Sequence, residues 1–371
     1  MIAHRVVRNP KFSWLLPGTI PSLLIFCNFS STWSMKKDPA LESALSRNRR
    51  WIVNNQLKNI ILRCPNQATP VRFLQKKFKT LDLKGKAPNW IKKYPRCFET
   101  FMQENEPWCR LTKRMMALVE EEEIVKSGQE PVLVERLAKF LMLSKDRRIN
   151  AMKFNEFKRN FGFPDDYFIS IIPKYPELFR VINFSGKRNG LEIELLSWDP
   201  NLALSFLERK VQEEGKESPS FQCLLPLTWK KSREKFIEFN ESPYISPYAE
   251  LPNENFKEKR DVGLIHEILS LTLWKKASIV KLGHFKREFI LPDRLDIMLM
   301  KHPGIFYVSN RYQIHTVVLR EGYSGSELID KDPLVIVKDK FGELMQEGLH
   351  EYNRRRCALN LEKKKQNLIP R

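Results

Sequence analysis

The chain has 371 residues, of which 42% are hydrophobic and 11% aromatic, so it carries enough apolar surface for two or three folded cores and is not a disordered chain. Its formal net charge of +20 favours polyanionic partners, nucleic acid before an anionic membrane surface. The six cysteines include no C-x-x-C pair, which argues against both a zinc site and a disulfide framework.

Residues 1–34 have the composition of an organelle transit peptide. The first 37 residues contain no Asp or Glu, while Arg5, Arg8 and Lys11 lie among Ser, Thr and large apolar side chains. Because these cations come early and alternate with apolar residues, as an amphipathic import helix requires, we expect a mitochondrial protein, with the chloroplast as the alternative. The apolar run from Leu23 to Cys27 is far shorter than the roughly 20 residues that a membrane-spanning helix needs, so no membrane partner is expected.

A short signature, K-[YH]-P-x-x-F, occurs three times, beginning at Lys93, Lys174 and Lys301. Upstream of the last two copies the match lengthens, since residues 157–165 align with residues 285–293 without a gap. Residues 74–78 are a degraded first version of this block. Such self-similarity indicates repeated modules, and it favours an extended binding surface over one asymmetric catalytic site.

Each copy is predicted to form two short helices followed by a β-hairpin. In the second copy, Phe154, Phe157 and Phe161 fall on one helix face, which should be buried. Pro164 ends this helix and Pro176 ends the next, because the residue before a proline avoids helical angles. Apolar residues on both sides of a Gly-containing polar turn, at 179–182 and 191–195, then predict the hairpin.

The expected fold class is therefore α+β, predominantly helical, with three repeated helix-helix-β-hairpin (winged-helix-like) units joined by helical linkers. The units lie near residues 71–113, 144–200 and 281–320, and the linkers include helices at 114–143, 203–211 and 266–277. Residues 35–70 form an N-terminal extension, and residues 350–371 form a basic C-terminal tail. Units of this kind often bind nucleic acids, although the same architecture also serves protein docking.

Catalytic signatures are absent from the sequence. It contains no phosphate-binding loop, dinucleotide fingerprint, H-E-x-x-H or G-x-S-x-G motif, and its 14 glycines are too few and too scattered to build a phosphate cradle. The pair Asp165-Asp166 is explained as a helix cap. Cys97 takes the place of Leu178 and Ile305 in the other copies, which makes it a core position. We therefore expect no enzyme, no cofactor, no metal and no small-molecule substrate.

Basic side chains recur at equivalent places in the copies. Lys76, Arg159 and Arg287 follow the apolar anchor of the first helix by two residues and should face water. A lysine also opens each signature. These cations would neutralise phosphates, with an affinity that falls as salt rises. With neighbouring basic residues, the candidate RNA-binding set is Lys76, Lys93, Arg147, Arg148, Lys158, Arg159, Lys174, Lys187, Arg188, Lys286, Arg287 and Lys301.

The first copy should be the most electropositive of the three. Residues 71–99 carry nine Lys or Arg against two acids, whereas residues 281–311 carry six against three. Exposed aromatic side chains beside these charges, such as Trp90, Tyr94 and Tyr175, could stack on unpaired bases. For Tyr94 and Tyr175 a packing role is favoured, since each lies beside a helix-ending proline.

Several blocks of the chain resemble the plant organelle RNA recognition (PORR) domain of the What's This Factor group. They comprise residues 144–149, 161–167, 175–181, 195–199, 242–248, 302–307 and 316–321, and the resemblance spans residues 71–349. It implies a plant protein, imported into mitochondria or plastids, that binds organellar group II intron RNA and promotes splicing without catalysis. Other splicing factors are the further partners expected. Asn160 departs from the Arg-Asp pair usual in the family, but the basic residue before it is kept.

Two other classes of protein remain open. One is an interaction scaffold attached to the organelle ribosome or to splicing machinery, and the other is a mitochondrial DNA-binding factor built from proline-terminated helical repeats. RNA binding predicts a salt-sensitive interaction that weakens when Lys76, Arg159 and Arg287 are all replaced by Ala. A scaffold would instead lose its partners when apolar surface is changed.

Overall fold

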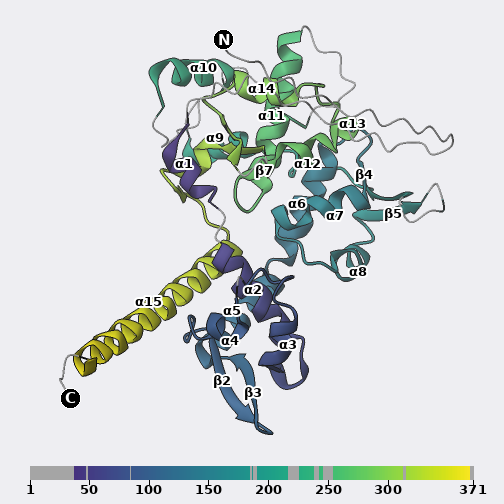
Figure 1. Cartoon of the computed structure of the whole chain (residues 1–371). Coiled ribbons are helices and arrows are strands. Elements are labelled where there is room, and N and C mark those ends of the chain that lie inside the picture. Colours follow the sequence, from purple (N-terminus) through teal and green to yellow (C-terminus); the bar gives the residue numbers. More distant parts are fainter. Residues whose placement is uncertain are drawn as a thin grey trace, which may run out of the picture. The chain divides into compact units, whose positions relative to one another are not determined.

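The computed structural model describes residues 37–46, 49–83, 85–183, 186, 190–215, 225–237, 242–244, 254–311 and 315–367 (Figure 1). The predicted transit peptide lies outside these residues. Within them the fold is α+β and predominantly helical, with small antiparallel sheets, as expected.

One succession of elements occurs three times: a helix, a short strand, shorter helices and a β-hairpin. In the first segment (residues 49–111) these are α2 (Arg49–Leu62), β1 (Ala68–Pro70), α3 (Val71–Lys76), α4 (Ala87–Ile91), β2 (Phe98–Gln103) and β3 (Glu106–Leu111). In the second segment (residues 130–195) they are α6 (Glu130–Met142), β4 (Arg148–Asn150), α7 (Ala151–Phe161), α8 (Tyr167–Ser170), β5 (Phe179–Asn183) and β6 (Leu191–Leu195).

The third segment (residues 254–319) repeats this order. Its elements are α11 (Glu254–Leu271), β7 (Lys276–Ser278), α12 (Ile279–Gly283), α13 (Lys286–Phe289), α14 (Leu295–Lys301), β8 (Phe306–Ser309) and β9 (Thr316–Leu319). In all three segments the short first strand pairs with the last strand of the hairpin, which gives the sheet orders β1-β3-β2, β4-β6-β5 and β7-β9-β8. The three hairpins therefore each sit in a sheet of the same connectivity.

Three linker predictions need correction. Residues 114–143 are two helices, α5 (Lys113–Gly128) and α6, because Gln129 ends the first helix and Pro131 opens the next. Residues 266–277 are not one helix, since α11 ends at Leu271 and residues 276–278 are strand β7. The helix expected at 203–211 is α9 (Phe206–Glu214), which begins later because Ser205 and Glu208 form a capping box.

The remaining elements connect and close the segments. They are α1 (Pro39–Ala44), the 3₁₀ turns Pro65–Gln67, Ile172–Lys174 and Arg320–Gly322, α10 (Leu227–Ile237), β10 (Tyr323–Ser324), β11 (Glu327–Leu328) and α15 (Pro333–Asn367). Helix α15 is the basic tail's helix, but it begins well before residue 350. Its Phe341, Leu344 and Met345 join the apolar core of the first segment, to which α2 also contributes Val53 and Leu57.

An aromatic cluster joins the second and third segments. The ring of Phe140 lies 5.0 Å from Phe161 and 5.7 Å from Phe154 in the second segment, and 5.1 Å from Phe289 and 5.3 Å from Phe285 in the third, measured between centroids. All five side chains are at most 1% exposed, so the aromatic helix face predicted in the second copy is buried. The two aligned phenylalanine blocks thus share one core.

Candidate nucleic-acid interface

The recurring Lys-[Tyr/His]-Pro signature holds a carboxylate of the preceding long helix in two of the three segments. In the second segment, Lys174 Nζ lies 2.7 Å from Glu130 Oε2, and Tyr175 OH donates to Glu130 Oε1 at 3.3 Å. In the third, Lys301 Nζ lies 3.4 Å from Glu258 Oε2. His302 Nε2 lies 3.0 Å from the other oxygen of this carboxylate. Lys174 therefore joins the turn before β5 to helix α6. Lys301 joins α14 to helix α11 in the same way.

These contacts appear in the pKa values of the groups involved. Burial raises the pKa of Glu258, but His302 and Lys301 outweigh that effect and hold it below its ordinary value. Burial also lowers the pKa of His302, against the opposing influence of Glu258. The hydrogen bond from Lys174 lowers the pKa of Glu130.

The first segment lacks this carboxylate. Counted back from the first strand of each segment, Arg50 takes the place of Glu130 and Glu258. The neutral Asn54 of α2 accepts a hydrogen bond from Trp90 Nε1 at 2.9 Å. Lys93 accordingly makes no ion pair within the part of the chain that the structure describes, and its Nζ lies 5.8 Å from the centre of the Trp90 ring.

A second recurring contact closes the break between the two short helices. In the second segment Asp165 binds both Lys158 and Arg159, each at 3.2 Å, and in the third segment Asp293 binds Lys286. In the first segment a hydrogen bond between neutral groups closes this break: Gln75 Oε1 accepts from the backbone N–H of Ala87 at 2.7 Å. In the first segment an arginine thus stands in place of the first kind of carboxylate, and the neutral Gln75 stands in place of the lysine that binds the second kind.

The twelve predicted cations consequently fall into three groups. Six are paired with carboxylates: Arg148, Lys158, Arg159, Lys174, Lys286 and Lys301. Four make no ion pair among the described residues: Lys76, Lys93, Arg147 and Arg287. Lys187 and Arg188 lie outside the described residues. Lys76, Arg159 and Arg287 are all exposed, as expected, but Asp165 already binds the second of them.

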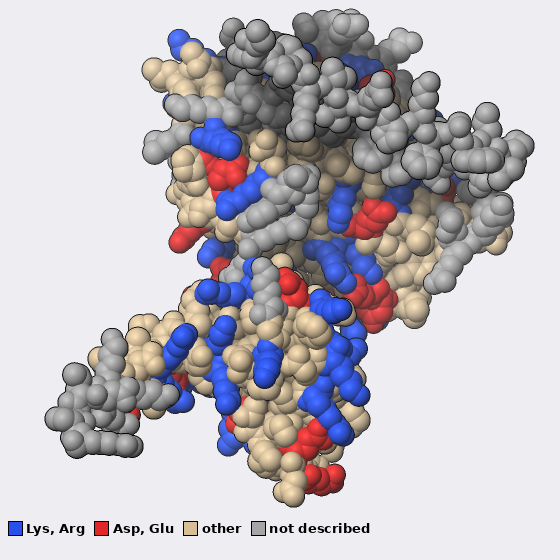
Figure 2. Space-filling view, in the orientation of Figure 1, with Lys and Arg blue, Asp and Glu red and all other residues tan. Residues whose placement is uncertain are grey.

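The first segment carries further lysines that sequence reasoning did not single out. Together with the two already named, the lysines of α3, α4 and the residues beside them that lack an ion pair within the described ranges are Lys76, Lys77, Lys79, Lys86, Lys92 and Lys93. Figure 2 shows Lys and Arg side chains gathered over this part of the chain. The excess of cations in residues 71–99 was the signal that could have found them.

Exposed aromatic side chains accompany these lysines, but they are not the ones expected. Trp90 is 7% and Tyr94 2% exposed, so both are core residues and neither can receive a base; Tyr175 is half-buried. Phe73 and Phe78 are instead 39% and 37% exposed, and Lys77 Nζ lies 5.0 Å above the Phe73 ring.

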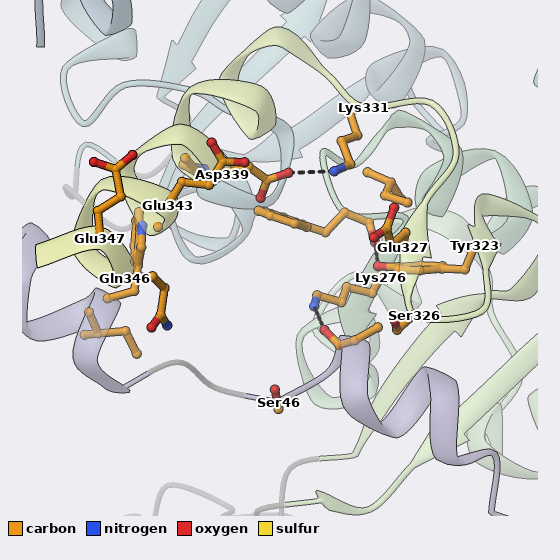
Figure 3. Close-up of a pocket in the computed structure, with 17 residues that line it drawn as sticks. Ser46, Lys276, Tyr323, Ser326, Glu327, Lys331, Asp339, Glu343, Gln346 and Glu347 are labelled. Carbon is orange, nitrogen blue, oxygen red and sulfur yellow. Dashed lines mark hydrogen bonds and ion pairs between the residues drawn. The ribbon is translucent and has the colours of Figure 1, made fainter. Parts of the chain in front are cut away.

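A cavity of about 890 Å³ is lined by residues of α1, α2, β7, β10, β11 and α15 (Figure 3). Lys276 lies in it, donating to the carbonyl of Ala44 at 3.3 Å, and burial lowers the pKa of this lysine to about 8. Asp339, Glu343 and Glu347 line the α15 side. Lys331 and Lys338 lie among these carboxylates, and Lys331 is paired with Asp339, so the lining has mixed charge and does not single out a polyanion.

The described ranges contain no helix both long and apolar enough to span a bilayer, and no group of three His, Cys, Asp or Glu side chains that could hold a metal ion. Cys97 is fully buried, which confirms it as a core position, and burial raises the pKa of its thiol to about 12.

Fold and surface together define a basic α+β protein of three similarly ordered segments, one of which presents lysines and phenylalanines to solvent. The chain belongs to the family of the plant organelle RNA recognition (PORR) domain, whose family model matches residues 36–350.

Similar proteins come from several plants. A chloroplastic homologue of WHAT'S THIS FACTOR 1 from Arabidopsis thaliana is 34% identical over 84% of this chain and 62% of its own length. The mitochondrial WHAT'S THIS FACTOR 9 and ROOT PRIMORDIUM DEFECTIVE 1 of the same plant are 30% and 31% identical, over 78% and 77% of this chain and 78% and 76% of their own. The chain thus spans less than two thirds of the first of these relatives. No solved structure matches the chain.

Proposed function

We propose that this chain is an organellar RNA-binding protein that binds group II intron RNA and promotes its splicing without catalysing the reaction itself. The observation that carries the proposal is the group of carboxylate-free lysines on the first segment of a chain that belongs to an RNA-recognition family. Lysines held by no carboxylate can replace the counterions of an RNA backbone, which stabilises a compact intron fold. The intron would supply the chemistry, and other splicing factors would be its protein partners.

The three segments fit winged-helix-like units. Each has a long helix, a strand, further short helices and a hairpin. In each, the first strand pairs with the second strand of the hairpin and so forms a three-stranded sheet. Relatives named as chloroplastic or mitochondrial support an organellar location, and within the organelles we propose the mitochondrion, with the chloroplast as the alternative.

The test is equilibrium binding of purified protein to a fluorescent group II intron transcript, measured by anisotropy between about 50 and 200 mM salt. We expect binding that weakens steeply over this range. The triple variant Lys76→Ala, Arg159→Ala, Arg287→Ala should raise Kd severalfold, with Arg159 contributing least because Asp165 already binds it. A duplex DNA of equal length serves as competitor. Failure to bind any transcript at low salt would overturn the proposal, and stronger binding to the DNA would favour the DNA-binding alternative.

A further inference from the structure

We infer that unpaired RNA is contacted by the first segment, on a face formed by α3, Lys77, Phe78, Lys79 and α4, while most of the predicted cations of the second and third segments are held in ion pairs within the fold. This inference rests on the proposed RNA-binding function and narrows it to one surface and one form of RNA.

In the second and third segments the lysines at these positions are bound to carboxylates. Lys174 and Lys301 each bind a glutamate that also contacts the next residue, Tyr175 or His302. Lys158 and Lys286 each bind an aspartate. A lysine paired with a carboxylate has little net charge to offer. A phosphate that binds this lysine must compete with the carboxylate and is repelled by its negative charge. The first segment has Arg50 where the other two have Glu130 and Glu258, so Lys93 meets no such carboxylate. Lys76 likewise makes no ion pair among the described residues.

The geometry of α3 places cations and a ring on one surface. Phe73, Lys76 and Lys77 are three and four residues apart, which brings them to the same helix face, and all three are exposed. Leu74, about 100° around the helix from Phe73, is fully buried. The exposed ring of Phe78 follows at the end of the helix, and Lys79 comes next. Lysines and exposed phenylalanines therefore lie close together within the short stretch from Phe73 to Lys79.

The exposed rings of Phe73 and Phe78 favour unpaired over double-stranded RNA. Stacking of a base on a protein ring is worth about 1–3 kcal/mol per base, but a base inside a duplex already stacks on its neighbours and cannot use the ring. Phe73 and Phe78 are exposed in the chain by itself, so a base that covers them also removes apolar surface from water. A surface of rings between lysines consequently favours single-stranded over double-stranded RNA.

The experiment uses the full chain, a fluorescein-labelled 20-nucleotide unpaired RNA and the same RNA annealed to its complement. Lys76→Ala, Lys77→Ala, Lys79→Ala should raise Kd at least tenfold and reduce the slope of log K against log salt by about 2, at about 0.7 for each phosphate that the variant no longer neutralises. The matched control, Lys230→Ala, Lys331→Ala, Lys340→Ala, removes the same charge from exposed lysines that are paired with Glu234, Asp339 and Glu121. It should change Kd less than threefold.

The aromatic contribution is tested separately. Phe73→Ala with Phe78→Ala should raise Kd for the unpaired RNA about tenfold, leave the salt slope unchanged and barely affect the duplex. Its matched control is Met152→Ala with Ile169→Ala, which removes apolar side chains that are 45% and 80% exposed in the second segment. Lys86→Glu with Lys92→Glu provides an independent charge variant on α4 should the lysine triple variant unfold.

The outcomes separate this inference from the function on which it rests. If wild-type protein binds RNA but the first-segment variants match their controls, or if Arg147→Ala, Arg159→Ala, Arg287→Ala lowers affinity as much as the lysine triple variant, the inference is overturned and the proposed function stands. Equal binding of duplex and unpaired RNA, with no effect of the phenylalanine changes, overturns the stated form of RNA. If no RNA binds, both fail.

Discussion

At the scale of single residues, the recurring signature is explained by a partner that the sequence does not show. Alignment of the copies found the Lys-[Tyr/His]-Pro block, but the carboxylates it binds lie 44 and 43 residues upstream of the two lysines, in helices that carry no repeated motif. Only the folded chain shows that Lys174 and Lys301 are paired with carboxylates, whereas Lys93 makes no ion pair among the described residues. Predicted cations could therefore be found from spacing, whereas their availability to a ligand could not.

Glu258→Gln should lower the pKa of His302 further. Burial already lowers this pKa, and the carboxylate is the group that opposes burial. A buried imidazole with a lowered pKa binds fewer protons in the folded state than in the unfolded state, so stability falls as the pH drops below the unfolded value of about 6.5. The variant should make that fall steeper.

The measurement is an NMR titration of His302, together with urea unfolding between pH 5 and 8. Glu130→Gln is the matched control, since it removes the equivalent carboxylate of the second segment and should leave His302 unaffected. An unchanged imidazole pKa in Glu258→Gln would contradict the contact.

Gly162→Ala should destabilise the fold by about 1–3 kcal/mol, since a left-handed backbone disfavours a side chain and the new methyl group is crowded. Gly162 has φ +93° at the end of α7, and a Cβ there would stand 3.3 Å from both Leu273 and Leu334. Gly215 also has a positive φ, +61°, but open space around it, so Gly215→Ala should cost less. Chemical unfolding of both variants compares the two contributions, and equal losses would show that crowding is unimportant.

At the scale of elements, the helices and hairpins could be predicted because their signals are local. Buried phenylalanines at helical spacing, helix-ending prolines and alternating residues around a turn all lie within a few positions of one another. The strands β1, β4 and β7 could not, because each has only three residues and exists through pairing with the distant last strand of its hairpin, as Ile149 does with Ile193. The end of α13 in the third segment could not be predicted either, because the residue aligned with Gly162 is Ile290. Ile290 takes a left-handed φ of 53°, although glycine is the residue expected in that conformation.

Phe140→Ala should destabilise both the second and the third segments, by about 3–5 kcal/mol, because its ring contacts both halves of the shared aromatic cluster. Hydrogen exchange of α7 and α13 should accelerate together. Phe140→Leu keeps most of the volume and should cost less. Independent exchange of the two helices in the Ala variant would show that the segments have separate cores.

At the scale of the whole molecule, α15 packs against the first segment, from which it is far removed in sequence. Phe341 and Leu344 are buried against the first segment's core, and Arg114 of α5 binds Glu347 at 2.8 Å. Residues 353–362 of the same helix are exposed. One helix thus completes a core with its first half and leaves part of its second half to solvent.

Deletion of residues 353–371 should leave the melting temperature within a few degrees of the full chain's, since the described side chains removed are exposed. Deletion of residues 333–371 should unfold the first segment and abolish RNA binding, because the apolar face of its core is uncovered. Thermal unfolding and anisotropy on both truncated proteins provide the measurement. A first segment that stays folded without α15 would refute the closing role of this helix.

The joining of α15 to the first segment also sets an order of events during synthesis. Ribosomes release a polypeptide from its N-terminus, so α2 to α5 emerge long before their last apolar neighbours, Phe341, Leu344 and Met345, have been translated. The lysine-bearing surface on those early helices can therefore reach its final shape only after α15 has been translated. A product that stops before Phe341 would lack the last apolar residues of this core.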